Sequence, residues 1–148
     1  MTAAKTRLPI LMAEDDEDDR LLFQEAMAEN QFENPLYFAE DGEDLMAFLL
    51  HQGKYTNPAS SPRPGLILLD LNMPRKDGRQ ALDEIKSDSN LKSIPIVVLT
   101  TSRQEDDLVR SYGAGVNSFI VKPTQFNSLV EVAASISQYW LELVRLPE

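Results

Sequence analysis

Four consecutive aliphatic residues, Leu66 to Leu69, lead directly into a lone aspartate, Asp70. The run lacks any alternation of apolar and polar side chains, which is the pattern of a strand buried on both faces. Such strands belong to parallel sheets that carry helices on both sides. The turn-forming pairs Met73-Pro74 and Asp77-Gly78 follow and end the strand. Asp70 is therefore expected at the carboxyl end of a buried strand, where its charge is costly unless another group pairs with it.

Similar apolar segments recur along the chain, and segments with helical spacing of apolar residues lie between them. Strands that alternate with helices predict the α/β class, as one doubly wound parallel sheet. The segment 53–65, rich in Pro, Ser and Gly, is expected to be a surface loop. Ligands of such a sheet bind outside the carboxyl ends of its strands. We expect strands at 8–13, 35–39, 65–70, 94–100 and 118–121, and helices at 17–30, 42–51, 79–88, 104–113 and 125–144.

Length and composition exclude several kinds of protein. The 148 residues suffice for a single domain, 1–148, with a core from about residue 8 to 144 and a short tail at 145–148. The absence of cysteine excludes disulfides and thiolate chemistry. No apolar run approaches the roughly 18 residues of a membrane span, and the start lacks a signal-peptide core, so we expect a cytoplasmic protein with no membrane partner. A formal charge of −10 argues against binding nucleic acid.

Polar residues stand at the carboxyl ends of four of the expected strands. They are Glu14-Asp15, Asp70, Thr100-Thr101 and Lys122. Two carboxylates about 4 Å apart repel each other by roughly 4 kcal/mol at an effective dielectric constant near 20, so three in one crevice call for a cation. Oxygen ligands suit Mg²⁺ rather than zinc. Carboxylates, Mg²⁺, a hydroxyl and an amine together suit phosphoryl chemistry, with Asp70 as the nucleophile that forms an aspartyl phosphate.

Each of these signals has a simpler structural explanation. Residues 16–19 are also acidic, and a helix start attracts acidic side chains through its dipole. We assign these four to the helix and Glu14 and Asp15 to the crevice. Thr100 or Thr101 could merely cap the next helix, and a lysine before a proline is common in loops. His51 receives no role.

The order of these motifs resembles that of the receiver domain of two-component response regulators, over nearly the whole chain. The resemblance implies a flavodoxin-like fold with five helices and five parallel strands in the order 2-1-3-4-5. It also implies that Asp70, in "LILLDLNMP", is the phosphoacceptor, and that Mg²⁺ is bound by Glu14, Asp15, Asp70 and the backbone carbonyl of Asn72. Thr100 in "PIVVLTTS" and Lys122 in "SFIVKP" would contact the phosphoryl group, Thr100 and Phe119 would act as the switch, and the Lys122-Pro123 peptide would be cis.

A narrower resemblance concerns the motif "LTTS", the long last helix and the tail "YWLELVRLPE". These features are similar to single-domain regulators that partner bacterial and cyanobacterial phytochrome kinases. Three residues depart from the commonest family pattern: Glu14 where Asp is frequent, Thr101 where Ala, Gly or Ser is usual, and Phe119 where Tyr is common. The departures bear on the lifetime of the phosphoryl group rather than on the chemistry.

The last helix carries a wider apolar arc than one core-facing stripe needs. Val132, Tyr139 and Leu146 lie outside the stripe, and we expect them to form a homodimer face with the fourth helix and fifth strand. The alternative is one broad stripe under a loop. The expected core stripe consists of Phe126, Leu129, Ala133, Ile136, Trp140 and Leu143.

The combined expectation is a stand-alone response regulator that takes a phosphoryl group from a sensor histidine kinase, and not a turnover enzyme. Kinase specificity is expected on the first helix, where one or two of Leu21, Leu22 and Phe23 should be core and the rest exposed. One alternative is a pseudo-receiver that binds partners without phosphorylation. Another is a haloacid-dehalogenase-like phosphohydrolase, which needs a second aspartate at the position that Asn72 occupies.

Overall fold

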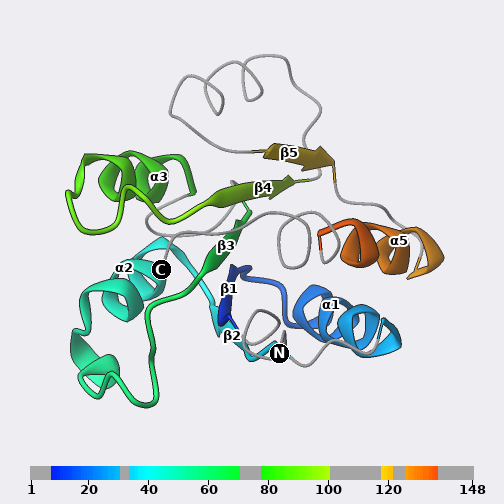
Figure 1. The fold of residues 1–148 in the computed structure, drawn as a ribbon, viewed down its shortest axis with the longest axis horizontal. Coiled ribbons are helices and arrows are strands. Elements are labelled where there is room, and N and C mark those ends of the chain that lie inside the picture. Colours follow the sequence, from blue (N-terminus) through cyan, green and yellow to red (C-terminus); the bar gives the residue numbers. More distant parts are fainter. Residues whose placement is uncertain (1–7, 31–33, 71–77, 101–117, 122–125, 137–148) are drawn as a thin grey trace, which may run out of the picture.

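The computed structural model describes residues 8–30, 34–70, 78–100, 118–121 and 126–136. Within them, parallel strands form one sheet in the order β2-β1-β3-β4-β5 (Figure 1). The predicted parallel α/β sheet is confirmed, and its strand order is the one that the family resemblance implies. The strands are β1 (Ile10–Ala13), β2 (Leu36–Ala39), β3 (Leu66–Leu69), β4 (Ile96–Thr100) and β5 (Ser118–Val121).

Helices cover both faces of this sheet. Helix α1 packs against α5 on one face, and α2 packs against α3 on the other (Figure 1). The helix expected at 104–113 lies outside the described residues, as does the part of the last predicted helix beyond residue 136. The described α-helices are α1 (Glu17–Glu29), α2 (Gly42–Leu50), α3 (Gly78–Ser87) and α5 (Phe126–Ile136).

Successive strand residues enter two different hydrophobic cores. Leu11 and Ile67 are buried with residues of α2 and α3, whereas Ile10 and Leu68 are buried with residues of α1 and α5. Each fully buried aliphatic side chain contributes about 1.5–3 kcal/mol relative to an exposed one. Both faces of the central strands are apolar because both are covered, which explains the missing alternation in the sequence.

The segment 53–65 is more ordered than the predicted surface loop. It begins with a short 3₁₀ helix, η2 (Gly53–Tyr55). Most of the segment is exposed, but Ser61 is buried and its hydroxyl donates to the carbonyls of Tyr55 and Asn57, at 3.0 and 2.9 Å. These hydrogen bonds close the segment on itself, and the 2.9 Å contact between His51 Nε2 and the Ser61 carbonyl oxygen ties it to the end of α2.

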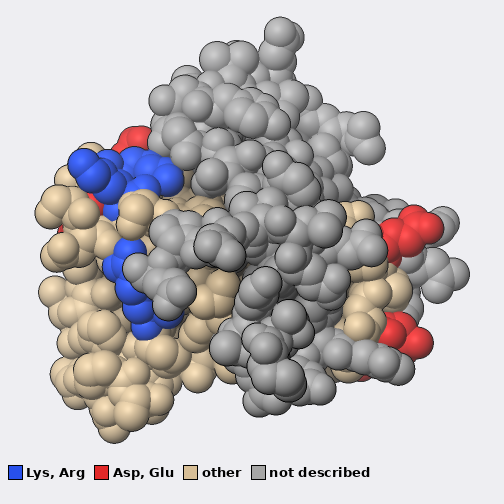
Figure 2. Space-filling model, in the orientation of Figure 1, with Lys and Arg blue, Asp and Glu red and all other residues tan. Residues whose placement is uncertain are grey.

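Charge is unevenly distributed over the molecule. On the face that Figure 2 shows, Lys and Arg side chains gather on the side of α2 and α3, whereas Asp and Glu side chains lie on both sides. No helix within the described ranges is both long and apolar enough to cross a membrane.

Candidate metal centre

Three carboxylates meet at the carboxyl ends of β1 and β3. One ligand oxygen from each of Glu14, Asp15 and Asp70 lies within 4.8 Å of the other two. The register of the sheet causes this meeting, because Ala13 is the neighbour of Leu69 and the Asp70 amide donates to the Ala13 carbonyl at 3.1 Å. The structure therefore brings together the carboxylates that the sequence placed at this crevice.

The three carboxylates differ in how far they are exposed to solvent. Glu14 is 1% exposed and Asp70 is 7% exposed, whereas the Asp15 side chain faces solvent. The buried pair, Glu14 and Asp70, would repel each other at this separation by about 3.5 kcal/mol at an effective dielectric constant near 20, and the repulsion involving the exposed Asp15 is weaker. Oxygen ligands at such spacing fit a hard divalent cation such as Mg²⁺ or Mn²⁺, which would remove this repulsion.

Glu14 is held at both its side chain and its backbone. The Asp16 amide donates to Glu14 Oε2 at 3.2 Å. The guanidinium of Arg20 donates from Nη1 to the Glu14 backbone carbonyl at 2.7 Å. Arg20 could not be predicted as part of this site from the sequence, because a side chain that reaches back to a carbonyl leaves no pattern of spacing or hydropathy.

The remaining acidic residues of this stretch start helix α1. Asp16 caps the helix, since its Oδ1 accepts from the amides of Asp18 and Asp19 at 2.9 and 3.2 Å. Glu17, Asp18 and Asp19 occupy the first turn, where carboxylates interact favourably with the helix dipole. The assignment of residues 16–19 to the helix start is thereby confirmed.

Several predicted site residues are described only in part or not at all. Thr100 ends β4 opposite Val121, and Phe119 lies in β5 opposite Val98, so their backbones have the expected places in the sheet. The roles of their side chains stay predictions, because the structure does not describe those side chains. The same holds for the predicted residues that lie outside the described ranges, which are Asn72, Lys122 with the Lys122-Pro123 peptide, Tyr139 and Leu146.

Val132 was predicted to belong to a dimer face, but much of its side chain packs against the core of its own subunit. It is half-buried against the cluster that contains Ala133 and Ile136. On α1, Phe23 is buried while Leu21 and Leu22 are 54% and 39% exposed, which confirms the predicted division of that helix into core and exposed positions.

A second polar cluster surrounds Tyr55. Its hydroxyl donates to Asp44 Oδ1 at 2.7 Å. Burial raises the pKa of the Tyr55 hydroxyl well above its ordinary value, and the hydrogen bond and charge of Asp44, with the charges of Glu40 and Asp41, raise it further. This cluster joins η2 to the start of α2.

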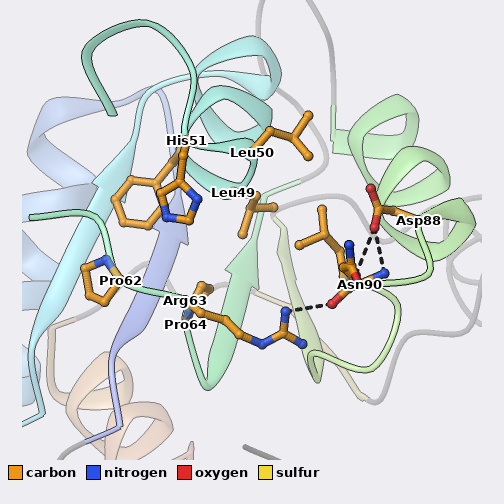
Figure 3. A pocket seen from close by; sticks show the side chains of 10 residues that line it. Leu49, Leu50, His51, Pro62, Arg63, Pro64, Asp88 and Asn90 are labelled. Carbon is orange, nitrogen blue, oxygen red and sulfur yellow. Dashed lines mark hydrogen bonds between the residues drawn. The ribbon is translucent and has the colours of Figure 1, made fainter. Parts of the chain in front are cut away.

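A pocket of about 310 Å³ lies at the opposite, amino end of the strands (Figure 3). Arg63 reaches across to Asn90 and donates from Nη1 to its carbonyl at 2.6 Å. His51 ends α2 with a left-handed φ of 56°, and its Nε2 lies 2.9 Å from the Ser61 carbonyl oxygen. These polar groups bind neighbouring loops to one another, and the described lining of the pocket includes none of the three carboxylates at the other end of the strands. Its lining consists of Phe48, Leu49, Leu50, His51, Pro62, Arg63, Pro64, Asp88, Asn90 and Leu91.

Comparison with known proteins gives consistent matches. The family model for the response regulator receiver domain matches residues 10–134. The chain is 47% identical over 138 residues to the response regulator Rcp1 of Synechocystis sp., covering 93% of this chain and 92% of that protein.

Two solved structures are similar over nearly the whole chain. One is the phosphorylated cyanobacterial phytochrome response regulator RcpA, with a TM-score of 0.89 and 43% identity over 96% of this chain and 99% of that one. The other is the Mn²⁺-bound form of Rcp1, with a TM-score of 0.86 and 45% identity over 95% and 99%. This chain therefore belongs to the response regulator receiver domain family, whose members are signalling proteins of two-component systems.

Proposed function

We propose that this chain is a stand-alone cytoplasmic response regulator that accepts a phosphoryl group on Asp70 from a sensor histidine kinase of the phytochrome type. The observation that carries the proposal is the meeting of the Glu14, Asp15 and Asp70 carboxylates within 4.8 Å at the ends of β1 and β3. The likeness to the phytochrome response regulator RcpA supports the kinase class.

Mg²⁺ would be held by the three carboxylates and the backbone carbonyl of Asn72, and it would neutralise charge on the phosphoryl oxygens. An Asp70 oxygen then attacks the phosphorus of a phosphohistidine. The P–N bond breaks, its electron pair goes to the imidazole, and an acyl phosphate forms on Asp70. Thr100 and Lys122 would contact the remaining phosphoryl oxygens. Positioning and charge compensation supply most of the rate in such transfers.

The exposed part of α1 supplies a surface for the kinase. Leu21 and Leu22 are large apolar side chains that face solvent, 54% and 39% exposed, one turn beyond the helix start that follows the metal centre. Apolar residues exposed beside a reactive site are typical of a protein contact. We assign them to recognition of the kinase.

The output surface would be the homodimer face of the fourth helix, fifth strand and fifth helix. In the switch, Thr100 would move toward the new phosphoryl group and Phe119 would fill the space that it leaves. Val132 is half-buried against its own core, so Tyr139 and Leu146 would supply the larger part of the contact. Sedimentation as a monomer at micromolar concentration, both with and without a phosphoryl analogue, would contradict this dimer.

Intact mass after incubation with acetyl phosphate and Mg²⁺ tests the central chemistry. The wild type should gain one phosphoryl group, and the gain should vanish without Mg²⁺ and in Asp70→Asn. Asp83→Asn is the matched control, because Asp83 is an exposed carboxylate on α3 and its loss should leave the gain intact. A wild type that gains nothing from any donor would instead favour the pseudo-receiver.

Transfer from a phytochrome-type kinase tests the partner. Replacing Leu21 and Leu22 by Ala should slow transfer from the kinase while phosphorylation by acetyl phosphate continues unchanged. Equal slowing with both donors would contradict a docking role. Turnover of a phosphate monoester by the wild type would favour the phosphohydrolase.

A further inference from the structure

Arg20 joins helix α1 to the loop that carries two of the three carboxylates. Its Nη1 donates to the Glu14 backbone carbonyl at 2.7 Å, across six residues of chain. The side chain is half-buried, so this contact is partly screened from water. A hydrogen bond from a charged donor at this length is stronger than one between neutral groups.

The contact completes a set of restraints on a single residue. The Glu14 amide donates to the Ala39 carbonyl at 2.9 Å, which ties the end of β1 to β2. The Glu14 carboxylate accepts from the Asp16 amide at 3.2 Å. Arg20 restrains the remaining backbone group, the carbonyl, whose peptide unit leads directly into Asp15. The direction of the chain at this carbonyl therefore decides where the Asp15 carboxylate lies relative to Asp70.

We propose that Arg20 is a positioning residue that sets the affinity of the carboxylate cluster for Mg²⁺, an inference that rests on the proposed function. It acts through the Glu14 carbonyl and touches neither the metal nor the phosphoryl group. Groups that hydrogen-bond to metal-binding residues typically change metal affinity by about 10- to 100-fold when removed. Loss of the Arg20 guanidinium should weaken Mg²⁺ binding about tenfold, at the low end of that range because Glu14 keeps its hydrogen bonds to Ala39 and Asp16.

The positive charge of Arg20 should affect the affinity for Mg²⁺ in the opposite direction to its hydrogen bond, so the two roles predict different results. A cation near the cluster repels Mg²⁺, so a purely electrostatic role predicts tighter binding when the guanidinium is removed. Arg20→Met keeps the aliphatic stem and removes both the charge and the donor. Arg20→Lys keeps the charge and the ability to donate a hydrogen bond, and it should restore most of the affinity.

Arg63 provides a matched control at the other end of the sheet. It also donates from Nη1 to a backbone carbonyl, that of Asn90, at 2.6 Å. If Arg20 only anchors a loop, Arg20→Met and Arg63→Met should each lower the melting temperature and leave Mg²⁺ affinity unchanged. A positioning role predicts that affinity falls in Arg20→Met alone.

The experiment is calorimetric titration of Mg²⁺ into the wild type, Arg20→Met, Arg20→Lys, Arg63→Met and Asp70→Asn, with a melting curve for each. The inference is supported if the affinity for Mg²⁺ falls about tenfold in Arg20→Met, recovers in Arg20→Lys and does not change in Arg63→Met. Unchanged or tighter binding by a folded Arg20→Met overturns it while the proposed function stands. A wild type that binds no Mg²⁺ and gains no phosphoryl group overturns both. If Arg20→Met does not fold, wild-type affinity in a folded Arg20→Gln, whose shorter amide lacks the charge and the reach, overturns the inference.

Discussion

Replacing Asp70 by Asn should stabilise the protein when no divalent metal is present. The ligand oxygens of Glu14, Asp15 and Asp70 lie within 4.8 Å of one another. At this distance two charges repel each other by about 3.5 kcal/mol at an effective dielectric constant near 20, and by about 0.9 kcal/mol in water. The first figure applies to Asp70 with Glu14, since both are buried, and the second to Asp70 with the exposed Asp15.

The measured gain will be smaller than this repulsion. Asp70 also takes part in further interactions. Where a carboxylate accepts a hydrogen bond, that bond contributes about 1.5–3 kcal/mol, which an amide retains only in part. The expected net gain is about 2 kcal/mol. In a protein of this size, that corresponds to a rise of about 4–8 °C in melting temperature.

Mg²⁺ should reverse the ranking of the two proteins. A ligand at 100 times its dissociation constant stabilises the folded state by about 2.7 kcal/mol. The wild type should gain this increment, whereas Asp70→Asn should gain little, because one of its charged ligands has been removed.

Urea unfolding in EDTA and in saturating Mg²⁺ measures both effects in one series, with Asp83→Asn as the control for loss of an unrelated charge. The reasoning fails if Asp70→Asn is less stable than the wild type in EDTA. It also fails if both proteins gain the same stability from Mg²⁺.

Three further predictions concern the rest of the fold. Phe23→Ala should cost about 3–5 kcal/mol because Phe23 is buried in the core against α5, whereas Leu22→Ala, at an exposed position, should change stability by only about 0.5 kcal/mol; urea unfolding compares them. Gly65→Ala should cost about 1–3 kcal/mol, since a Cβ there would lie 2.9 Å from the Cβ of Leu8, and a melting temperature equal to the wild type's would refute the clash. The raised pKa of Tyr55 means that its protonated hydroxyl contributes to the stability of the folded state. This contribution is complete below about pH 10, the ordinary tyrosine value, and is lost as the pH rises further. In Tyr55→Phe, the free energy of unfolding measured above that pH should therefore fall less steeply.

The sheet could be predicted because its central strands leave an unambiguous pattern. Leu66 to Leu69 are apolar at every position, and the structure buries alternate side chains in the two cores on either side of the sheet. The candidate site followed from the same pattern, since residues directly after parallel strands share one edge. Glu14, Asp15 and Asp70 were found in this way without any knowledge of side-chain geometry.

Contacts made across the chain could not be predicted in the same way. Arg20 reaches back to a carbonyl, and Ser61 is buried by hydrogen bonds within its own loop. Neither contact changes the local periodicity of apolar residues, which was the signal used. Val132 shows what periodicity cannot predict. Periodicity gives the direction in which a side chain points around a helix. The width of the buried face of α5 depends instead on how closely residues of α1 and the strands approach that helix.

The acidic stretch 14–19 shows why position relative to the strand matters more than charge. Glu14 and Asp15 follow β1 directly, and the ladder bond from the Asp70 amide to Ala13 brings β3 alongside them. Asp16 turns away to cap α1, and the next three acids interact with its dipole. The cap fixes where α1 begins, and this start places Arg20 within reach of the Glu14 carbonyl. Residues 16–19 thus help to position Glu14 and Asp15 without binding the metal themselves. They start helix α1, and α1 carries Arg20, which restrains the loop at Glu14.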